Sequence, residues 1–236
     1  LTKHNVPVTV FAVGKALELN AEVAASMREA TDRHGWEIAS HGWRWIDYHD
    51  VDEVTERAHI RKVKELHLEL FGKVPAGIYQ GKPNVDTRRL VVEEGFRYDA
   101  DSYSDDLPYW NLEHGKPHLI VPYTLSENDM RFVSPSGFSN GREFSAYLID
   151  YFDALLEEGM DGAPKMMSVG LHCRVVGRPG RAAHLEKFLK HVAAKAPGDV
   201  WITTREGIAR HWYEQHWPEG HGEPPKAGVD EPRPPR

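Results

Sequence analysis

The 236-residue chain has a single cysteine, Cys173, and no uninterrupted apolar run near the roughly 20 residues of a membrane-spanning helix. One thiol cannot form an internal disulfide or a cysteine-based zinc cluster, and it is compatible with a reducing compartment. Basic residues are also scarce, because 29 lysines and arginines stand against 36 aspartates and glutamates, a formal net charge of −7. A nucleic-acid surface needs a basic stripe. We therefore expect neither a nucleic acid nor a membrane among the partners.

The beginning of the chain lacks two further features. It opens at Leu1 rather than at a methionine, and no basic segment followed by an apolar stretch marks a signal peptide. We expect a fragment or a processed product, located in the cytoplasm.

Apolar positions alternate between strand-like and helix-like periods along the chain. Strands are predicted over residues 6–13, 37–40, 76–79, 96–101, 118–123, 166–171 and 200–203. Helices are predicted over residues 21–34, 51–71, 87–94, 144–159, 182–195 and 206–217, with Asp50 as the cap of the second. This alternation indicates βα units around a mainly parallel sheet, either a (β/α) barrel or a doubly wound sheet.

The predicted domain covers residues 1–217. Residues 218–236 hold six of the sixteen prolines and almost no large apolar side chains, so a mobile tail is expected there. Irregular structure is expected over residues 102–117 and 126–140. In either candidate fold, reactive groups are expected at the carboxyl ends of the strands.

The loop after the strand at 37–40 concentrates His41, Trp43, Arg44 and Trp45. A His-x-x-x-His pair would offer two imidazoles to one metal ion. Trp45 stands four residues after His41, and an indole donates a hydrogen bond but does not bind a metal. His49 would substitute only if the loop folded back. We therefore predict no metal and no cofactor, with tryptophans that merely plug the sheet end as the alternative.

Two more strand ends carry chemical groups. His172 ends the strand predicted at 166–171, where an imidazole exchanges protons near neutral pH. Arg174, Arg178 and Arg181 follow it and suit a carboxylate, ureido or phosphate group, although solvated arginines are common. Four carboxylates, at positions 99, 101, 105 and 106, follow the strand at 96–101. They are suited to hold a metal, to orient a histidine and take up a proton, or to shape a turn.

Residues 40–48, 99–110, 122–132 and 171–181 resemble the polysaccharide deacetylase (NodB-like) superfamily, and more narrowly its metal-independent allantoinase branch. The resemblance implies a distorted (β/α) barrel with one or more strands before Leu1. It assigns His172 the place of a general acid and His41 that of the first metal-motif histidine, with Trp45 replacing the second. Ile78 and the run 80–82 depart from the branch, which carries Trp and Thr-Gly-Arg there.

The implied reaction is hydrolysis of allantoin to allantoate, with a small molecule as substrate and a homo-oligomer as the assembly. The catalytic residues are expected to be His172, His41 and Asp101, with His172 oriented by a carboxylate from residues 99–106. The expected substrate-binding residues are Trp43, Arg44, Trp45, Tyr79, Asp105, Trp110 and Arg174. The alternatives are a zinc-dependent N-deacetylase of chitin or peptidoglycan and a non-catalytic truncated barrel.

Overall fold

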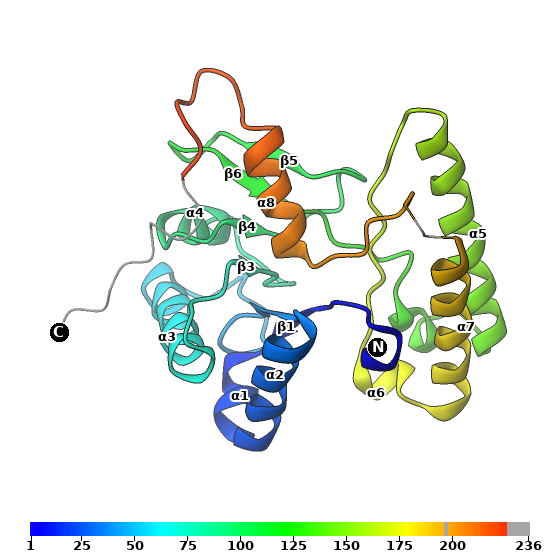
Figure 1. The fold of residues 1–236 in the computed structure, drawn as a ribbon. Coiled ribbons are helices and arrows are strands. Elements are labelled where there is room, and N and C mark those ends of the chain that lie inside the picture. The colour runs from blue at the N-terminus through cyan, green and yellow to red at the C-terminus, as the bar shows by residue number, and fades with distance from the viewer. Residues whose placement is uncertain (196–197, 226–236) are drawn as a thin grey trace. The chain divides into compact units, whose positions relative to one another are not determined.

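A computed structural model describes residues 1–195 and 198–225 (Figure 1). They fall into two compact units. The first contains residues 1–102 and 108–121 and the described residues from Thr203 onward. The second contains residues 103–107 and the described part of 122–202. The tail expected at 218–236 falls largely outside the described residues.

The first unit is built on one parallel sheet with a single antiparallel strand. Its strands are β1 (Thr9–Ala12), β2 (Glu37–Ser40), β3 (Gly77–Ile78), β4 (Tyr98–Asp99), β5 (Tyr109–Asn111) and β6 (His118–Ile120). They lie in the order β1-β2-β3-β4-β6-β5, and only β5 runs antiparallel to its neighbour. The predicted α/β class is therefore confirmed. Strand β5 was missed, because it lies within the stretch expected to be irregular.

The strand register brings the carboxyl ends of the parallel strands into line. Ala12, Ser40, Ile78, Asp99 and Ile120 form one row across five strands. The residues that follow them therefore leave the sheet at the same edge. This is the edge at which parallel sheets present their reactive groups.

The helices of the first unit are η1 (Thr2–His4), α1 (Gly14–Leu19), α2 (Ala21–His34), α3 (Glu53–Phe71), α4 (Thr87–Glu93) and α8 (Arg205–Gln215). Helices α2 and α3 end at Gly35 and Gly72, which have φ values of 63° and 74° that favour glycine. The cap of α3 is Asp52 rather than Asp50, since the Asp52 carboxylate accepts the N–H of Thr55. Four of the predicted helices are thus confirmed, with this one cap corrected.

A buried polar group joins the amino ends of three strands. The Tyr98 hydroxyl donates to Glu37 at 2.7 Å, and the Thr9 hydroxyl donates to the same carboxylate at 2.6 Å. Gly77 makes room for Tyr98, because a Cβ at that position would lie 1.9 Å from the phenol ring. The opposite edge of the sheet is thus left to the candidate reactive groups.

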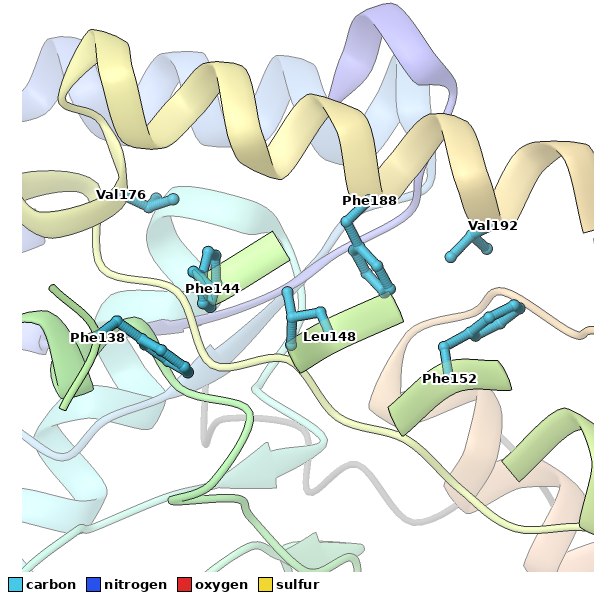
Figure 2. Close-up of a cluster of buried hydrophobic side chains, with 7 residues drawn as sticks. All are labelled: Phe138, Phe144, Leu148, Phe152, Val176, Phe188 and Val192. Atoms are coloured by element: carbon cyan, nitrogen blue, oxygen red, sulfur yellow. The ribbon is translucent and has the colours of Figure 1, made fainter. Parts of the chain in front are cut away.

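The second unit is mainly helical. It contains η2 (Asp129–Val133), α5 (Gly141–Met160), α6 (Cys173–Val176) and α7 (Pro179–Lys195). Helices α5 and α7 lie side by side and share a buried cluster, which Figure 2 shows. The cluster consists of Phe138, Phe144, Leu148, Phe152, Val176, Phe188 and Val192. Helix α5 supplies every fourth residue from Phe144 to Phe152, the spacing that places side chains on one helix face. None of the described helices is both long and apolar enough to cross a membrane.

Two predicted strands of this region are wrong. The segment 166–171 makes only an isolated bridge between Gly170 and Asn128, because Met167, Val169 and Leu171 pack against the helical cluster instead. The segment 200–203 also forms no strand, and Trp201 and Ile202 are 61% and 40% exposed, unlike the side chains of a buried strand.

Candidate functional site

His41 lies directly after β2 and is held by the residue that follows β3. Its Nδ1 atom is 2.5 Å from the carbonyl oxygen of Tyr79, and the two rings stack with centroids 5.2 Å apart. A carbonyl oxygen only accepts, so Nδ1 carries the hydrogen of this bond. In the neutral imidazole, Nε2 is therefore the basic nitrogen, able to accept a hydrogen bond or a proton.

Asp101 follows β4 at the same edge of the sheet. Its two carboxylate oxygens accept the backbone N–H groups of Gln80 and Gly81, each at 2.7 Å. Gly81 has a φ of 82°, and a Cβ there would come within 3.2 Å of the His41 ring. Glycine at this position thus lets the loop after β3 close around the Asp101 carboxylate, which places it beside His41 and Tyr79.

The environment of Asp101 changes its affinity for protons. Burial, and then the negative charge of Asp99, raise the pKa of Asp101 to about 7, although the bonds from Gln80 and Gly81 act in the opposite direction. A carboxyl group with this pKa exchanges its proton near neutrality, which suits general acid–base catalysis.

Asp99 differs from Asp101 although only one residue separates them. Burial alone would raise its pKa, but the hydrogen bond and charge of His118 and those of Arg88 lower it overall. The Oδ2 atom of Asp99 lies 3.1 Å from His118 Nε2 and 3.0 Å from Arg88 Nε. Neighbouring carboxylates with opposite pKa shifts are suited to different tasks: the lowered pKa favours the ionised form of Asp99, and the raised pKa favours proton exchange at Asp101 near neutral pH.

A second group of polar contacts fixes the loops after β2 and β3 to each other. The buried Glu56 of α3 accepts the Asn84 amide at 2.7 Å and the Thr87 hydroxyl at 2.6 Å. The same Asn84 amide donates to the carbonyl oxygens of Tyr48 and Val51. This arrangement is not predictable from the residue pattern, because Glu56 lies within an ordinary amphipathic helix.

In the second unit, His172 is bound to Asp129 at the start of η2. Its Nδ1 atom is 2.7 Å from Oδ1 of Asp129, while Oδ2 accepts the N–H groups of His172 and Val176 at 2.8 and 3.0 Å. The expected orienting carboxylate from residues 99–106 is therefore wrong. Asp129 was missed because 43 residues separate it from His172. The one local signal is Asn128, whose side chain caps η2 and leaves Asp129 in its first turn.

Two of the expected substrate-binding tryptophans pack within the first unit instead. Trp43 is 3% exposed, lies against Gly14 and has the Lys62 ammonium 4.0 Å from its ring centroid. Trp110 packs edge-on against Tyr213 and Trp217, and its Nε1 donates to the His216 carbonyl at 2.6 Å. Trp43 is thus buried within the protein, which corrects its expected role, whereas the half-buried Trp110 ring packs against two aromatic side chains.

The other expected ligand-binding residues have varied surroundings. Trp45 is 64% exposed, and the side chains of Arg44 and Arg174 are also exposed. The Asp105 carboxylate accepts the N–H of Leu107 at 3.0 Å, a turn contact that accounts for an aspartate at this position. Within the set, Tyr79 contacts His41, a proposed catalytic group.

The described residues do not fit a zinc site. In the described ranges, no three His, Cys, Asp or Glu side chains come together closely enough to hold a metal ion. The residue four positions after His41 is Trp45, whose indole is not a metal ligand.

Comparison with known proteins gives consistent results. The family model for polysaccharide deacetylase matches residues 1–98. A putative polysaccharide deacetylase of Schizosaccharomyces pombe is 42% identical over 231 residues, which is 91% of this chain and 70% of the relative. A probable polysaccharide deacetylase from Pseudomonas aeruginosa PAO1, with a solved structure, is 51% identical with a TM-score of 0.84. The crystal structure of Puue allantoinase matches with 49% identity and the same TM-score of 0.84. Each structure is matched over 91% of this chain and 70% of its own.

The fold and these likenesses define a hydrolase of the NodB-like α/β type. The chain belongs to the polysaccharide deacetylase family. Within that superfamily the solved relatives include an allantoinase, in agreement with the resemblance of the sequence motifs.

Proposed function

We propose that this protein opens the ring of allantoin by hydrolysis of a carbon–nitrogen bond, without a metal ion. The observation that carries the proposal is Trp45, an exposed indole at the position where a metal-binding deacetylase would need its second imidazole. The 49% identity to Puue allantoinase supports the same substrate.

The proposed reaction adds water to an amide carbonyl of the hydantoin ring. The water oxygen bonds to the carbonyl carbon and loses a proton to a base. The ring C–N bond then breaks, the leaving nitrogen takes up a proton, and the new carboxylic acid ionises to give allantoate. In the absence of a metal, side chains must move both protons and hydrogen-bond donors must stabilise the oxyanion.

Three side chains are proposed to act, each for a reason in its own surroundings. Asp101 is the proposed proton acceptor, since its pKa of about 7 makes it a stronger base than an ordinary carboxylate. His172 is the proposed proton donor, since Asp129 fixes its tautomer and leaves Nε2 to exchange the proton. His41 is the proposed hydrogen-bonding partner of the substrate, through the nitrogen that does not face Tyr79.

The exposed Arg44, Trp45 and Arg174 are proposed to contact the substrate, together with Tyr79. Guanidinium groups suit the carbonyl oxygens of a ureido group, and aromatic rings suit a small planar heterocycle. Trp43 is not included because it is buried, and Trp110 is not included because its ring packs against Tyr213 and Trp217.

Two substrates separate this proposal from polysaccharide deacetylation. The purified chain is incubated with allantoin and, in parallel, with an N-acetylated chito-oligosaccharide, and the release of allantoate and of acetate is followed. The proposal predicts allantoate and no acetate. Acetate release without allantoate would replace the proposal with the deacetylase, and turnover of neither substrate would favour a non-catalytic protein.

A further inference from the structure

A basic hollow lies at the amino-terminal ends of α5 and α7 in the second unit. Its volume is about 740 Å³, within the range of about 300–1,000 Å³ typical of small-molecule sites. It is lined by Asn140, Gly141, Arg142, Arg178, Gly180, Arg181 and His184. Three arginines and a histidine thus face one hollow without a carboxylate among the lining residues, in a chain with a net charge of −7.

The arginines of the basic hollow contrast with Arg57 of α3, which is surrounded by carboxylates. Arg57 pairs with Glu53, Glu93 and Glu94 at distances of 2.6 to 2.9 Å. Among the described residues, no carboxylate pairs with Arg142, Arg178 or Arg181. Like charges gathered without a counter-charge repel one another, and an anion would relieve that repulsion.

Packing within the unit forces these charges together. A Cβ on Gly141 would lie 2.7 Å from the His184 ring and 2.9 Å from the carbonyl oxygen of Gly180, so the two helix ends approach through glycine. Arg181 is held in place as well, because it stacks on Phe132 at 4.3 Å and donates to the Val175 carbonyl at 3.1 Å. The hollow is therefore held together by contacts of the fold.

His184 responds to this positive field. Its Nδ1 atom is 3.1 Å from the Ser145 hydroxyl oxygen. Desolvation, and then the charges of Lys187 and Arg142, lower the pKa of His184. An anion in the hollow would oppose the effect of Arg142, so this imidazole offers a local signal of binding.

We propose that the basic hollow binds a small molecule with two or more negative charges carried by phosphate or carboxylate groups. Guanidinium groups form paired, charge-assisted hydrogen bonds with both kinds of group. The size and concave shape of the hollow favour a small molecule over an extended acidic chain. The inference is independent of the proposed function, because allantoin carries no net negative charge.

The test uses the full chain and two probes, pyrophosphate and citrate, in isothermal titration calorimetry at low ionic strength. Saturable binding to one site is expected, and the stronger probe identifies the preferred anion. The double variant Arg142→Gln/Arg178→Gln should bind about a hundredfold more weakly, since it removes two charge-assisted contacts that are each worth about tenfold. Neither side chain has a hydrogen-bond or ion-pair partner among residues 1–195 and 198–225, so the variant is expected to remain folded.

Arg210→Gln is the matched control, because it removes an exposed arginine of α8 in the other unit. It should bind the probe as the unaltered chain does. In NMR titrations, bound anion should raise the pH midpoint of His184. Absence of saturable binding, or equal weakening by Arg210→Gln, would show only diffuse attraction to basic residues and would overturn the proposal.

Discussion

The Nδ1 atom of His172 lies 2.7 Å from Oδ1 of Asp129, a carboxylate with no exposed surface. An ionised carboxylate only accepts hydrogen bonds, so Nδ1 carries a hydrogen and Nε2 is the nitrogen proposed to donate the proton. The other Asp129 oxygen accepts two backbone N–H groups, which fixes the carboxylate in turn. The ring orientation of His172 is thus determined before any substrate arrives.

Replacement of Asp129 by asparagine should lower kcat for allantoin by about a hundredfold or more, the scale of general acid–base catalysis. The amide can present an N–H to the imidazole and favour the wrong tautomer. Stopped-time assays of allantoate release measure the effect. The control is Asp153→Asn, which breaks another Asp–His contact, 2.7 Å from His191, in the same unit. Equal activities of the two variants would remove Asp129 from the mechanism.

The rate should depend on the ionisation of Asp101. A base must be unprotonated to accept a proton from water, so kcat/KM should rise with pH through a midpoint near the pKa of about 7. In the Asp101→Asn variant, the rise of kcat/KM with pH should disappear, and the activity should be low at every pH. A limb centred near pH 4, the range of an unperturbed aspartate, would contradict the account.

Removal of the negative charge of Asp99 should shift the pH midpoint of kcat/KM. Its negative charge raises the pKa of Asp101, so Asp99→Asn should shift the midpoint of kcat/KM toward lower pH. The midpoint should move toward lower pH even if the variant is less stable. Without Asp99 as its partner, the positive charge of Arg88 also lowers the pKa of Asp101. The exposed Glu113→Gln change serves as the control for loss of one charge. An unmoved midpoint would show that the two carboxylates are not coupled.

His67 should make the fold sensitive to acid. Burial lowers its pKa to about 4, whereas the unfolded chain protonates near 6.5. The unfolded state then binds more protons between these values, so the free energy of unfolding should fall as the pH drops from about 6.5 toward 4. In urea titrations, the free energy of unfolding of His67→Leu should fall less between these two pH values than that of the unaltered chain. The variant His34→Leu, at an exposed position, should behave as the unaltered chain does. The same dependence of the free energy of unfolding on pH in all three proteins would contradict the prediction.

The helical cluster of the second unit should carry much of that unit's stability. Leu148 is fully buried on α5, and Leu148→Ala should cost about 2–5 kcal/mol in the free energy of unfolding. Leu125→Ala offers the same chemical change in the same unit at a position that is 60% exposed. Its cost should be well below that of Leu148→Ala in denaturant titrations. Similar costs would mean that the cluster does not hold the unit together.

Local patterns predicted the elements whose apolar positions follow one clear period. The helix at 144–159 was found because Phe144, Leu148 and Phe152 repeat at the helical spacing, and all three lie in the cluster of Figure 2. The strand expected at 166–171 has the alternation of a strand, but its apolar side chains pack on helices and its backbone bridges only once. The period of the apolar residues indicates which side of a segment is buried, but it does not indicate whether that side packs on helices or within a sheet.

Local patterns likewise predict some residues of the candidate site but not those whose role depends on distant contacts. His41, Asp101 and His172 are predicted as site residues because each follows a stretch with strand-like character, the place where parallel sheets expose reactive groups. Asp129 and Glu56 were not found, because their importance comes from contacts with residues 43 and 28–31 positions away. Trp43 and Trp110 were assigned to the substrate on residue type alone, and only tertiary packing shows that Trp43 is buried and that Trp110 packs against Tyr213 and Trp217.

The most direct test measures allantoate release before and after the protein is dialysed against a strong chelator, with the metal content determined in the same samples. Hydrolysis by side chains predicts the same turnover in both samples and metal far below one ion per chain. Loss of turnover on chelation, restored by stoichiometric zinc, would contradict the account.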